Sequence, residues 1–242
     1  MKRGDAPTKV VICDLDNVLF SADRFLAAIK SHIMERAGNA CDDQAFDRLY
    51  ENSKCNISGL CSAIAEQFHI PQDVVRKFFF EGEIQDFIIE GARHLIAPLR
   101  SDVRVIIATS GDREFQKSKV ERLKKSFPEL AGCETIISPD KNQKIAEVIQ
   151  EHSRMGEDRV IVIDDRADVL NAIYEALPEQ SRESVWFMRM KYGKYQDQPL
   201  PDCLIPITTE VTSLYGARET IQRLFFPENE PLLESTHYGM IK

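Results

Sequence analysis

Short apolar runs bounded by polar residues recur along this chain of 242 residues. Each run is too short to make a helix and shows no regular apolar–polar alternation. This pattern is typical of strands buried on both faces of a parallel sheet. The runs predict strands at residues 9–13, 103–108, 135–137, 159–163, 184–188 and 203–206.

Between these runs, apolar residues recur three and four positions apart, which is the spacing of helices that pack one face against a core. The spacing predicts helices at residues 92–99, 113–127, 142–151, 167–177 and 211–226. Strands and helices therefore alternate, which predicts an α/β fold with a doubly wound parallel sheet and helices on both of its faces. Residues 191–201 contain Gly193, Pro199 and Pro201 among polar residues and are predicted to be a loop.

One long block departs from this alternation. Residues 21–89 show helical spacing and little strand signal, so they predict a helical insertion after the first strand. The predicted organisation is a core of residues 1–20 and 90–226, an inserted helical domain of residues 21–89, and a peripheral tail of residues 227–242.

Composition narrows the classes of function. The chain is 43% hydrophobic and 29% charged, which is ordinary for a globular protein, and its net charge of -8 argues against a nucleic-acid partner. Because no run reaches the ~18 apolar residues that span a bilayer, and residues 1–5 lack a signal-peptide core, we expect a cytoplasmic protein without a membrane partner. The six cysteines form no CxxC pair, which predicts free thiols.

Chemically active side chains follow three of the predicted strands. Asp14 and Asp16 follow the first strand, Thr109–Asp112 the second and Asp164–Asp168 the strand at 159–163, while Lys141 lies 23 positions before Asp164. The carboxyl ends of parallel strands meet at one edge of a sheet, so we expect these groups to converge on one pocket.

These residues, in this order, resemble the four motifs of the haloacid dehalogenase-like superfamily, most of whose members are magnesium-dependent phosphatases. The first motif of that family, DxDx(T/V), is similar to Asp14–Val18, and its second, a hydrophobic strand ending in Thr or Ser, is similar to residues 106–109. Its lysine motif corresponds to Lys141, with Lys144 as an alternative, and its acidic motif to Asp164–Asp168. The resemblance covers about residues 9–190 and implies a Rossmann-like core.

The resemblance also implies a role for each group. Asp14 would be the nucleophile that forms an aspartyl-phosphate, and Asp16 would act as acid toward the leaving oxygen and then as base toward water. A cation has to offset the repulsion between a carboxylate and a phosphoryl group, and Lys141 would contribute to this. The phosphate-binding residues implied by the resemblance are Asn17, Thr109, Ser110, Gly111 and Lys141.

The implied cofactor is Mg²⁺, which favours oxygen ligands in octahedral geometry. The resemblance assigns it to Asp14, to the backbone carbonyl of Asp16 and to the acidic motif. That motif departs from the common GDxxxD pattern: Asp164 and Asp168 fit it best, because aligning Asp165 with the first acid leaves an apolar valine at the last position. Asp165 remains an alternative metal ligand.

Residues 21–89 resemble the helical C1 cap of this superfamily, which closes over the site and selects the substrate. The resemblance therefore implies a phosphomonoesterase that acts on a small phosphorylated metabolite such as a sugar phosphate or a nucleotide. A phosphomutase with the same aspartyl-phosphate chemistry and a non-catalytic binding or regulatory protein remain alternatives. Dehalogenases generally lack an acid at the position of Asp16, so its presence disfavours that reaction.

Overall fold

The computed structural model describes residues 9–38, 42–53, 55–96, 103–154 and 159–226. In these residues a six-stranded sheet has the order β3-β2-β1-β4-β5-β6, and every neighbouring pair of strands is parallel. The predicted doubly wound α/β fold is thereby confirmed. The strands are β1 (Lys9–Asp14), β2 (Val103–Thr109), β3 (Glu134–Ile137), β4 (Val160–Asp164), β5 (Val185–Met190) and β6 (Thr208–Val211).

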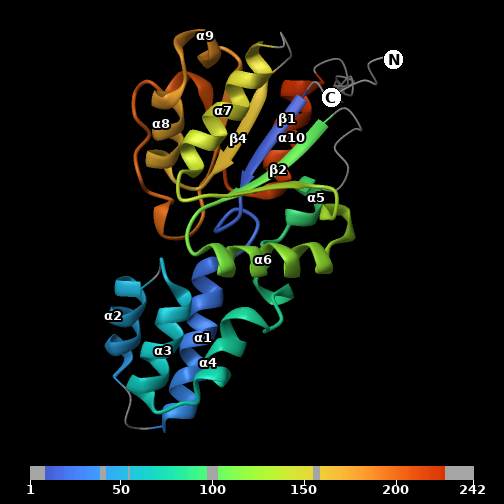
Figure 1. Ribbon diagram of the computed structural model, residues 1–242. Helices are drawn as coiled ribbons and strands as arrows, with labels where there is room; N and C mark the ends of the chain where they lie inside the picture. The colour runs from blue at the N-terminus through green and yellow to red at the C-terminus, as the bar shows by residue number, and fades with distance from the viewer. Residues whose placement is uncertain (1–8, 39–41, 54, 97–102, 155–158, 227–242) are drawn as a thin grey trace, which may run out of the picture.

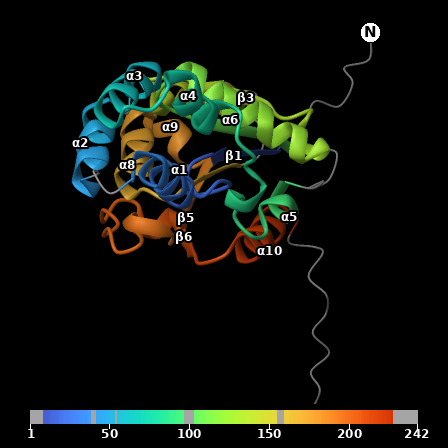
Figure 2. The same cartoon turned by 90° about the horizontal axis from the view of Figure 1, so that it is seen from below.

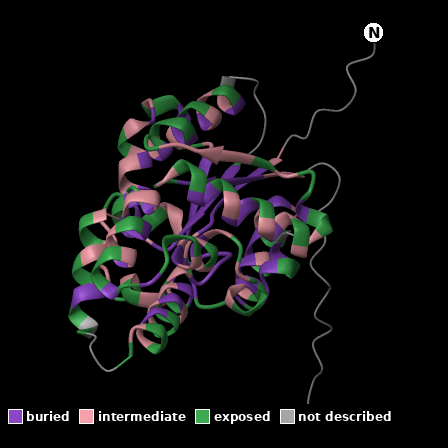
Figure 3. Cartoon of the chain, turned by 60° about the horizontal axis from the view of Figure 1, so that its bottom comes forward, coloured by how far each residue is buried: buried purple, intermediate pink, exposed green. Residues whose placement is uncertain are grey.

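Helices cover both faces of the sheet (Figure 1). Val10 and Ile12 belong to a buried cluster with apolar residues of α7 and α8, whereas Val11 and Cys13 belong to a cluster with residues of α6 and α10. Successive residues of β1 thus face opposite cores, which explains its unbroken apolar run and its burial. Figure 3 shows the buried strands at the centre of the molecule. The helices of the core are α5 (Ala92–Ile96), α6 (Arg113–Ser126), α7 (Lys141–Arg154), α8 (Ala167–Ala176), α9 (Glu179–Arg182) and α10 (Leu214–Phe225).

Four helices lie among the described residues of the predicted helical insertion, 21–89. They are α1 (Ala22–Ala37), α2 (Asp43–Ser53), α3 (Ile57–Phe68) and α4 (Gln72–Phe80), followed by the 3-10 turn η2 (Gln85–Phe87). Figure 1 shows them beyond the carboxyl ends of the strands. The segments that enter and leave the insertion run side by side, because Phe20 pairs with Ile88 and the amide of Ser21 donates to the carbonyl of Phe87 (2.7 Å).

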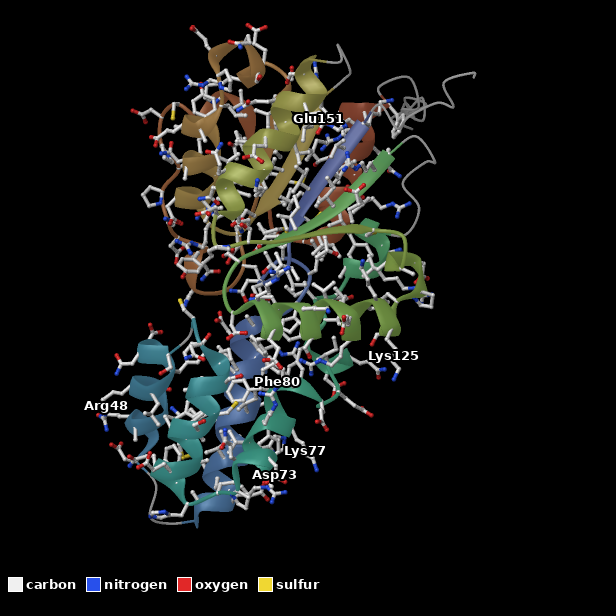
Figure 4. The ribbon with its side chains drawn as sticks, viewed as in Figure 1. Arg48, Asp73, Lys77, Phe80, Lys125 and Glu151 are labelled. Carbon is white, nitrogen blue, oxygen red and sulfur yellow. The ribbon has the colours of Figure 1, made fainter. Side chains whose placement is uncertain are left out.

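Aromatic side chains join the insertion to α6. Phe115 of α6 packs against Phe25 of α1 and against Phe79 and Phe80 of α4, with ring centroids 5.8–6.2 Å apart. Figure 2 shows α4 running beside α6, and Figure 4 places Phe80 at the end of α4 that faces α6. The helix α6 is therefore a part of the core against which the insertion packs.

The predicted strand at residues 203–206 is wrong. A 3-10 turn, η5, occupies Ile205–Ile207, and the last strand begins only at Thr208. Pro206 has no amide hydrogen to donate to a neighbouring strand, whereas the more polar β6 pairs with β5 and forms the edge of the sheet. A short 3-10 turn, η4 (Gly193–Tyr195), also interrupts the predicted loop.

The last helix begins three residues later than its apolar spacing predicts. Ser213 caps the amino end of α10, and its side chain accepts a hydrogen bond from the amide of Gly216. The predicted tail at 227–242 and the end of the helix predicted at 92–99 lie outside the described residues.

Two further expectations concern the chain as a whole. Within the ranges that the structure describes, no helix is both long and apolar enough to cross a membrane. The described cysteines carry free thiols, as their spacing predicts: Cys13, Cys55, Cys61, Cys133 and Cys203.

Candidate active site

The predicted residues converge at the carboxyl edge of the sheet. Asp14 is the last residue of β1, Thr109 the last of β2 and Asp164 the last of β4, so the three central strands deliver them side by side. Lys141, the first residue of α7, reaches between two of them: its Nζ lies 2.9 Å from Oδ1 of Asp14 and 2.8 Å from Oδ2 of Asp164. The buried Lys141 therefore bridges two buried carboxylates.

The lysine in this site is Lys141 and not the alternative Lys144. Lys144 lies one turn farther along α7, is half exposed and pairs with Glu147 (2.7 Å). Of the two lysines, Lys141, the first residue of the helix, is the one that contacts the carboxylates. The sequence alone could not separate the two because both lie near the same predicted helix start.

Three carboxylates face one another around this lysine. Oxygen atoms of Asp14, Asp164 and Asp165 lie within 4.8 Å of one another, and all three residues are buried. The two oxygens of Asp164 are engaged by Lys141 and by the backbone amide of Arg166 (3.0 Å), whereas Oδ2 of Asp165 is buried without a hydrogen-bond partner among the described residues. Such an unpartnered oxygen is costly unless a cation or a proton reaches it.

The charge of the site is unbalanced. Burial raises the pKa of Asp14 to about 7, and the charges of Asp164 and Asp16 add to this effect, while Lys141 opposes it. Burial, followed by the charges of Asp164 and Asp14, raises the pKa of Asp165 to about 8. For Lys141, burial lowers the pKa, but the two carboxylates outweigh burial and raise it, so the lysine remains charged. One cation therefore faces three acids.

This donor set fits Mg²⁺. The ion favours carboxylate, carbonyl and water oxygens and is usually held by one or two carboxylates, and here three lie together with one buried oxygen unpartnered. A divalent ion would also offset the excess negative charge. The residues that would hold it by side chain are Asp14, Asp164 and Asp165.

Asp168, which the sequence favours as a metal ligand, does not join these three. Its carboxylate forms an ion pair with Arg166 and accepts a hydrogen bond from Gln198 (3.1 Å), and its side chain is half exposed. The reason is geometric: Asp164 ends β4 and Asp165 directly follows it, whereas Asp168 is the second residue of α8. The geometry thus favours Asp165, the alternative, over Asp168.

These positions predict different responses to Mg²⁺. We expect the ion to raise the melting temperature of the wild-type protein and of Asp168→Asn, and to raise that of Asp165→Asn much less, because the ion stabilises only a folded state that binds it. Thermal unfolding with and without Mg²⁺ measures this. An Asp168→Asn variant that loses the response while Asp165→Asn keeps it would reverse the assignment.

A cavity of about 450 Å³ opens at this edge. The core contributes Asp14, Asp16, Thr109, Lys141 and Asp165, among others, to its wall. The insertion also contributes to the wall, through α1 and α2, and so does the turn after β5. These further lining residues, which the sequence did not single out, are Ala22, Asp23, Leu26, Tyr50, Glu51, Lys194 and Tyr195.

The loop after β2 joins the edge of the sheet to the amino terminus of α6. Thr109 is buried, Ser110 lines the cavity, and Gly111 has φ +115°, a conformation that residues with side chains rarely adopt. Asp112 then caps α6 by accepting from the amide of Phe115 (2.9 Å). The loop therefore leads from the sheet edge directly into a helix amino terminus, where anions are favoured.

Asn17 lies in the tight turn after β1. Its φ is +59°, a left-handed conformation that Asn tolerates better than most residues. The side chain is buried and lines the cavity, and its hydrogen bond to Asp165 opposes the rise in the pKa of that acid. Asn17 thus touches the acidic group directly.

Asp16 has partners that the sequence analysis missed. Lys119 of α6 places Nζ 2.5 and 2.8 Å from its two carboxylate oxygens, and Nε2 of Gln116 lies 3.0 Å from Oδ2. A signal was available: Lys119 lies four residues from both Phe115 and Leu123, on the apolar stripe of this helix. A lysine in phase with buried residues needs a partner inside the protein.

Known proteins of similar structure share this fold. No protein-family model matches the chain, and no curated protein matches its sequence. A crystal structure described as a haloacid dehalogenase-like hydrolase from Burkholderia xenovorans aligns with TM-score 0.71 and 18% identity, covering 90% of this chain and 98% of that one.

Two further structures cover similar shares of both chains. A haloacid dehalogenase-family hydrolase from Bacillus subtilis bound to magnesium aligns with TM-score 0.57 and 17% identity, covering 88% of this chain and 98% of that one. A protein described as a predicted phosphoglycolate phosphatase from Haemophilus somnus aligns with TM-score 0.57 and 9% identity, covering 91% and 100%. The chain therefore has the haloacid dehalogenase-like fold.

Proposed function

We propose that this protein is a magnesium-dependent phosphomonoesterase that acts on a small phosphorylated metabolite through an aspartyl-phosphate on Asp14. The observation that carries the proposal is the bridge of Lys141 between Asp14 and Asp164, beside Asp165, at the wall of a polar cavity. A carboxylate held this way has a cation beside it and an open cavity in front of it.

Each residue has a task in this reaction. A carboxylate oxygen of Asp14 attacks phosphorus while the bond to the leaving oxygen breaks, and Asp16 gives that oxygen a proton. Lys141 and the hydroxyl of Thr109 offset the charge of the nonbridging oxygens, together with the loop of Ser110 and Gly111. A bound Mg²⁺ would supply further positive charge to the phosphate and would be held by Asp14, Asp164 and Asp165, with the carbonyl of Asp16.

We further propose that residues 21–89 act as a cap of the C1 type over a core of residues 1–20 and 90–226. The insertion contributes Leu26, Tyr50 and Glu51 to the cavity wall, so it contacts whatever the core binds. Burial, followed by the charge of Asp16 and other nearby groups, holds the pKa of Tyr50 above its usual range, which keeps its phenol protonated as a hydrogen-bond donor. A cavity of about 450 Å³ suits a sugar phosphate, a nucleotide or a metabolite of similar size.

A substrate panel tests the proposal. We expect the purified protein to release phosphate from p-nitrophenyl phosphate and faster from at least one sugar phosphate, nucleotide or other small phosphate ester, in the presence of Mg²⁺. Excess EDTA should abolish phosphate release and added Mg²⁺ should restore it, because the acidic site then lacks its divalent cation. Phosphate release against time, at several substrate concentrations, measures both effects.

The other outcomes separate the alternatives. Phosphate moved to another hydroxyl of the same sugar, with little phosphate released, would indicate the phosphomutase. Activity that persists in EDTA would contradict the metal-dependent mechanism. Silence of a broad panel that includes aryl esters, with Mg²⁺ present and bound, would favour the non-catalytic binding protein.

A further inference from the structure

The inward face of α6 carries a lysine deep in the protein. Lys119 is only 2% exposed, and its Nζ contacts both oxygens of Asp16. Its other neighbours include the rings of Phe20 and Phe115, whose centroids lie 5.3 and 4.7 Å from Nζ. A buried ammonium among aromatic rings is costly without an anion, so the ion pair with Asp16 is what keeps Lys119 in place.

Lys119 contacts Asp16 from the interior of the protein, on the side away from the cavity. The side chain of Asp16 is 28% exposed and lines the cavity, whereas the side chain of Lys119 is 3% exposed behind it. Gln116 adds a third hydrogen bond from the same helix (3.0 Å). The carboxylate is therefore fixed from behind and open toward the cavity, so Lys119 acts on the substrate only through Asp16.

The same helix holds the insertion. Oδ2 of Asp112 accepts from the amide of Ile57 at the start of α3 (2.9 Å). Ser118 and Arg122 donate to backbone carbonyls at the end of α4 and just after it, at 2.7–3.0 Å. The helix α6 thus contacts both the insertion and the carboxylate of Asp16.

From these contacts we infer that Lys119 is a positioning residue for the reaction: with Gln116, it fixes the carboxylate of Asp16 at the cavity wall from the helix on which the insertion rests. The inference depends on the proposed function for what Asp16 does, but not for the ion pair itself.

The position of the Asp16 carboxylate should affect the second half of the reaction, hydrolysis of the aspartyl-phosphate, more than the first. A water oxygen forms a bond to phosphorus, the bond from phosphorus to the oxygen of Asp14 breaks, and the proton of the water passes to the carboxylate of Asp16. In the first half, p-nitrophenolate leaves as a stable anion and needs no proton. A displaced Asp16 therefore slows the second half and leaves the first half with this ester almost unchanged.

The test is Lys119→Met with p-nitrophenyl phosphate and Mg²⁺ in a rapid-mixing experiment. We expect a burst of p-nitrophenolate close to one equivalent per protein, followed by steady turnover that is lower by roughly 10²-fold, the size of a general-base contribution. The ratio of burst rate to steady rate should rise well above that of the wild type. Methionine is nearly as long as lysine and suits the aromatic surroundings, and Asp16 is partly solvated, so the variant should fold.

Two matched variants accompany it. Lys119→Arg should recover part of the steady rate, because a guanidinium can also bond both carboxylate oxygens. Lys117→Met, on the exposed side of the same helix in an ion pair with Glu121, should behave as the wild type. A Lys119→Met protein with wild-type kinetics overturns the inference, and so does one whose burst and steady rates fall by the same factor.

A stability measurement without substrate tests the ion pair between Lys119 and Asp16 even if no ester is hydrolysed. The changes in melting temperature of Lys119→Met and Asp16→Asn should be non-additive in the double variant, because each substitution removes the same ion pair. Additive changes would show that Lys119 does not hold Asp16 and would overturn the inference. Absence of hydrolysis by the wild type would overturn the phosphomonoesterase proposal and leave this measurement to decide the role of Lys119.

Discussion

Replacing Asp14 by asparagine should lower kcat for phosphate-ester hydrolysis by roughly 10³-fold or more, since the amide cannot form the aspartyl-phosphate and losses of this size or larger follow removal of a nucleophile. Asparagine has the shape of aspartate, and the contact of Lys141 with Asp164 does not involve the side chain that is replaced. The fold should therefore persist. Steady-state hydrolysis of the best ester from the panel measures the loss.

An exposed acid provides the matched control. Asp73→Asn changes a solvent-exposed carboxylate in the first turn of α4 (Figure 4), which does not line the cavity, and should leave kcat unchanged. Melting temperatures of the two variants check that both are folded. If Asp14→Asn keeps more than about a tenth of the wild-type kcat, Asp14 is not the nucleophile, because no covalent route could lose so little.

Lys141→Met should lower the free energy of unfolding by about 3–5 kcal/mol in protein stripped of divalent ions, because it leaves two buried carboxylates without their cation. Both carboxylates contact Nζ of Lys141 directly, and Asp165 lies beside them. Urea unfolding at equilibrium measures the difference from the wild type. Added Mg²⁺ should recover part of it, since the ion supplies positive charge to the same oxygens.

The loss should depend on pH in a definite direction. Without the lysine, the pKa of Asp14 rises further above about 7, while in the unfolded chain it returns to its ordinary value near 4. At pH values above about 7, the folded variant keeps a proton on Asp14 that the folded wild type has released, so the stability of the variant falls more steeply than that of the wild type as the pH rises there. The loss should be smaller at pH 5 than at pH 8.

The control for this prediction is Lys144→Met, three residues along the same helix. Lys144 is half exposed and pairs only with Glu147 among the described residues, so its removal should change the free energy of unfolding by less than about 0.5 kcal/mol. Equal stability of the two variants would mean that the bridge of Lys141 does not hold the site together.

Much of the fold was predictable because a strand that is buried on both faces of a sheet has a continuous run of apolar residues. Each of β1, β2 and β4 needs apolar residues at successive positions, so their runs mark them without ambiguity. The edge strand β6 has no such apolar run, because it pairs on one side only and contains Thr208, Thr209 and Glu210. The run at residues 203–206 was apolar for another reason: Leu204 belongs to the buried core cluster, and Pro206 lies within the 3-10 turn that follows it.

Some features of the candidate site were likewise predictable from the sequence, and others were not. The order of Asp14, Thr109, Lys141 and the acidic motif was visible, and parallel strands necessarily bring such ends together. The choice between Asp165 and Asp168 was not visible, because it depends on which carboxylate faces the lysine and which is drawn to Arg166 on the surface. Spacing in a motif does not specify side-chain direction.

The sequence by itself determined the alternation of strands and helices, the place of the helical insertion and the edge at which the acids meet, because these follow from burial and from the common direction of parallel strands. Only the tertiary structure decided which acids face Lys141 and that Lys119 lies behind Asp16. Those pairings join residues 23 to 127 positions apart, and packing between distant elements sets their distances. Asp16 is thus placed by a helix that begins almost a hundred residues after it.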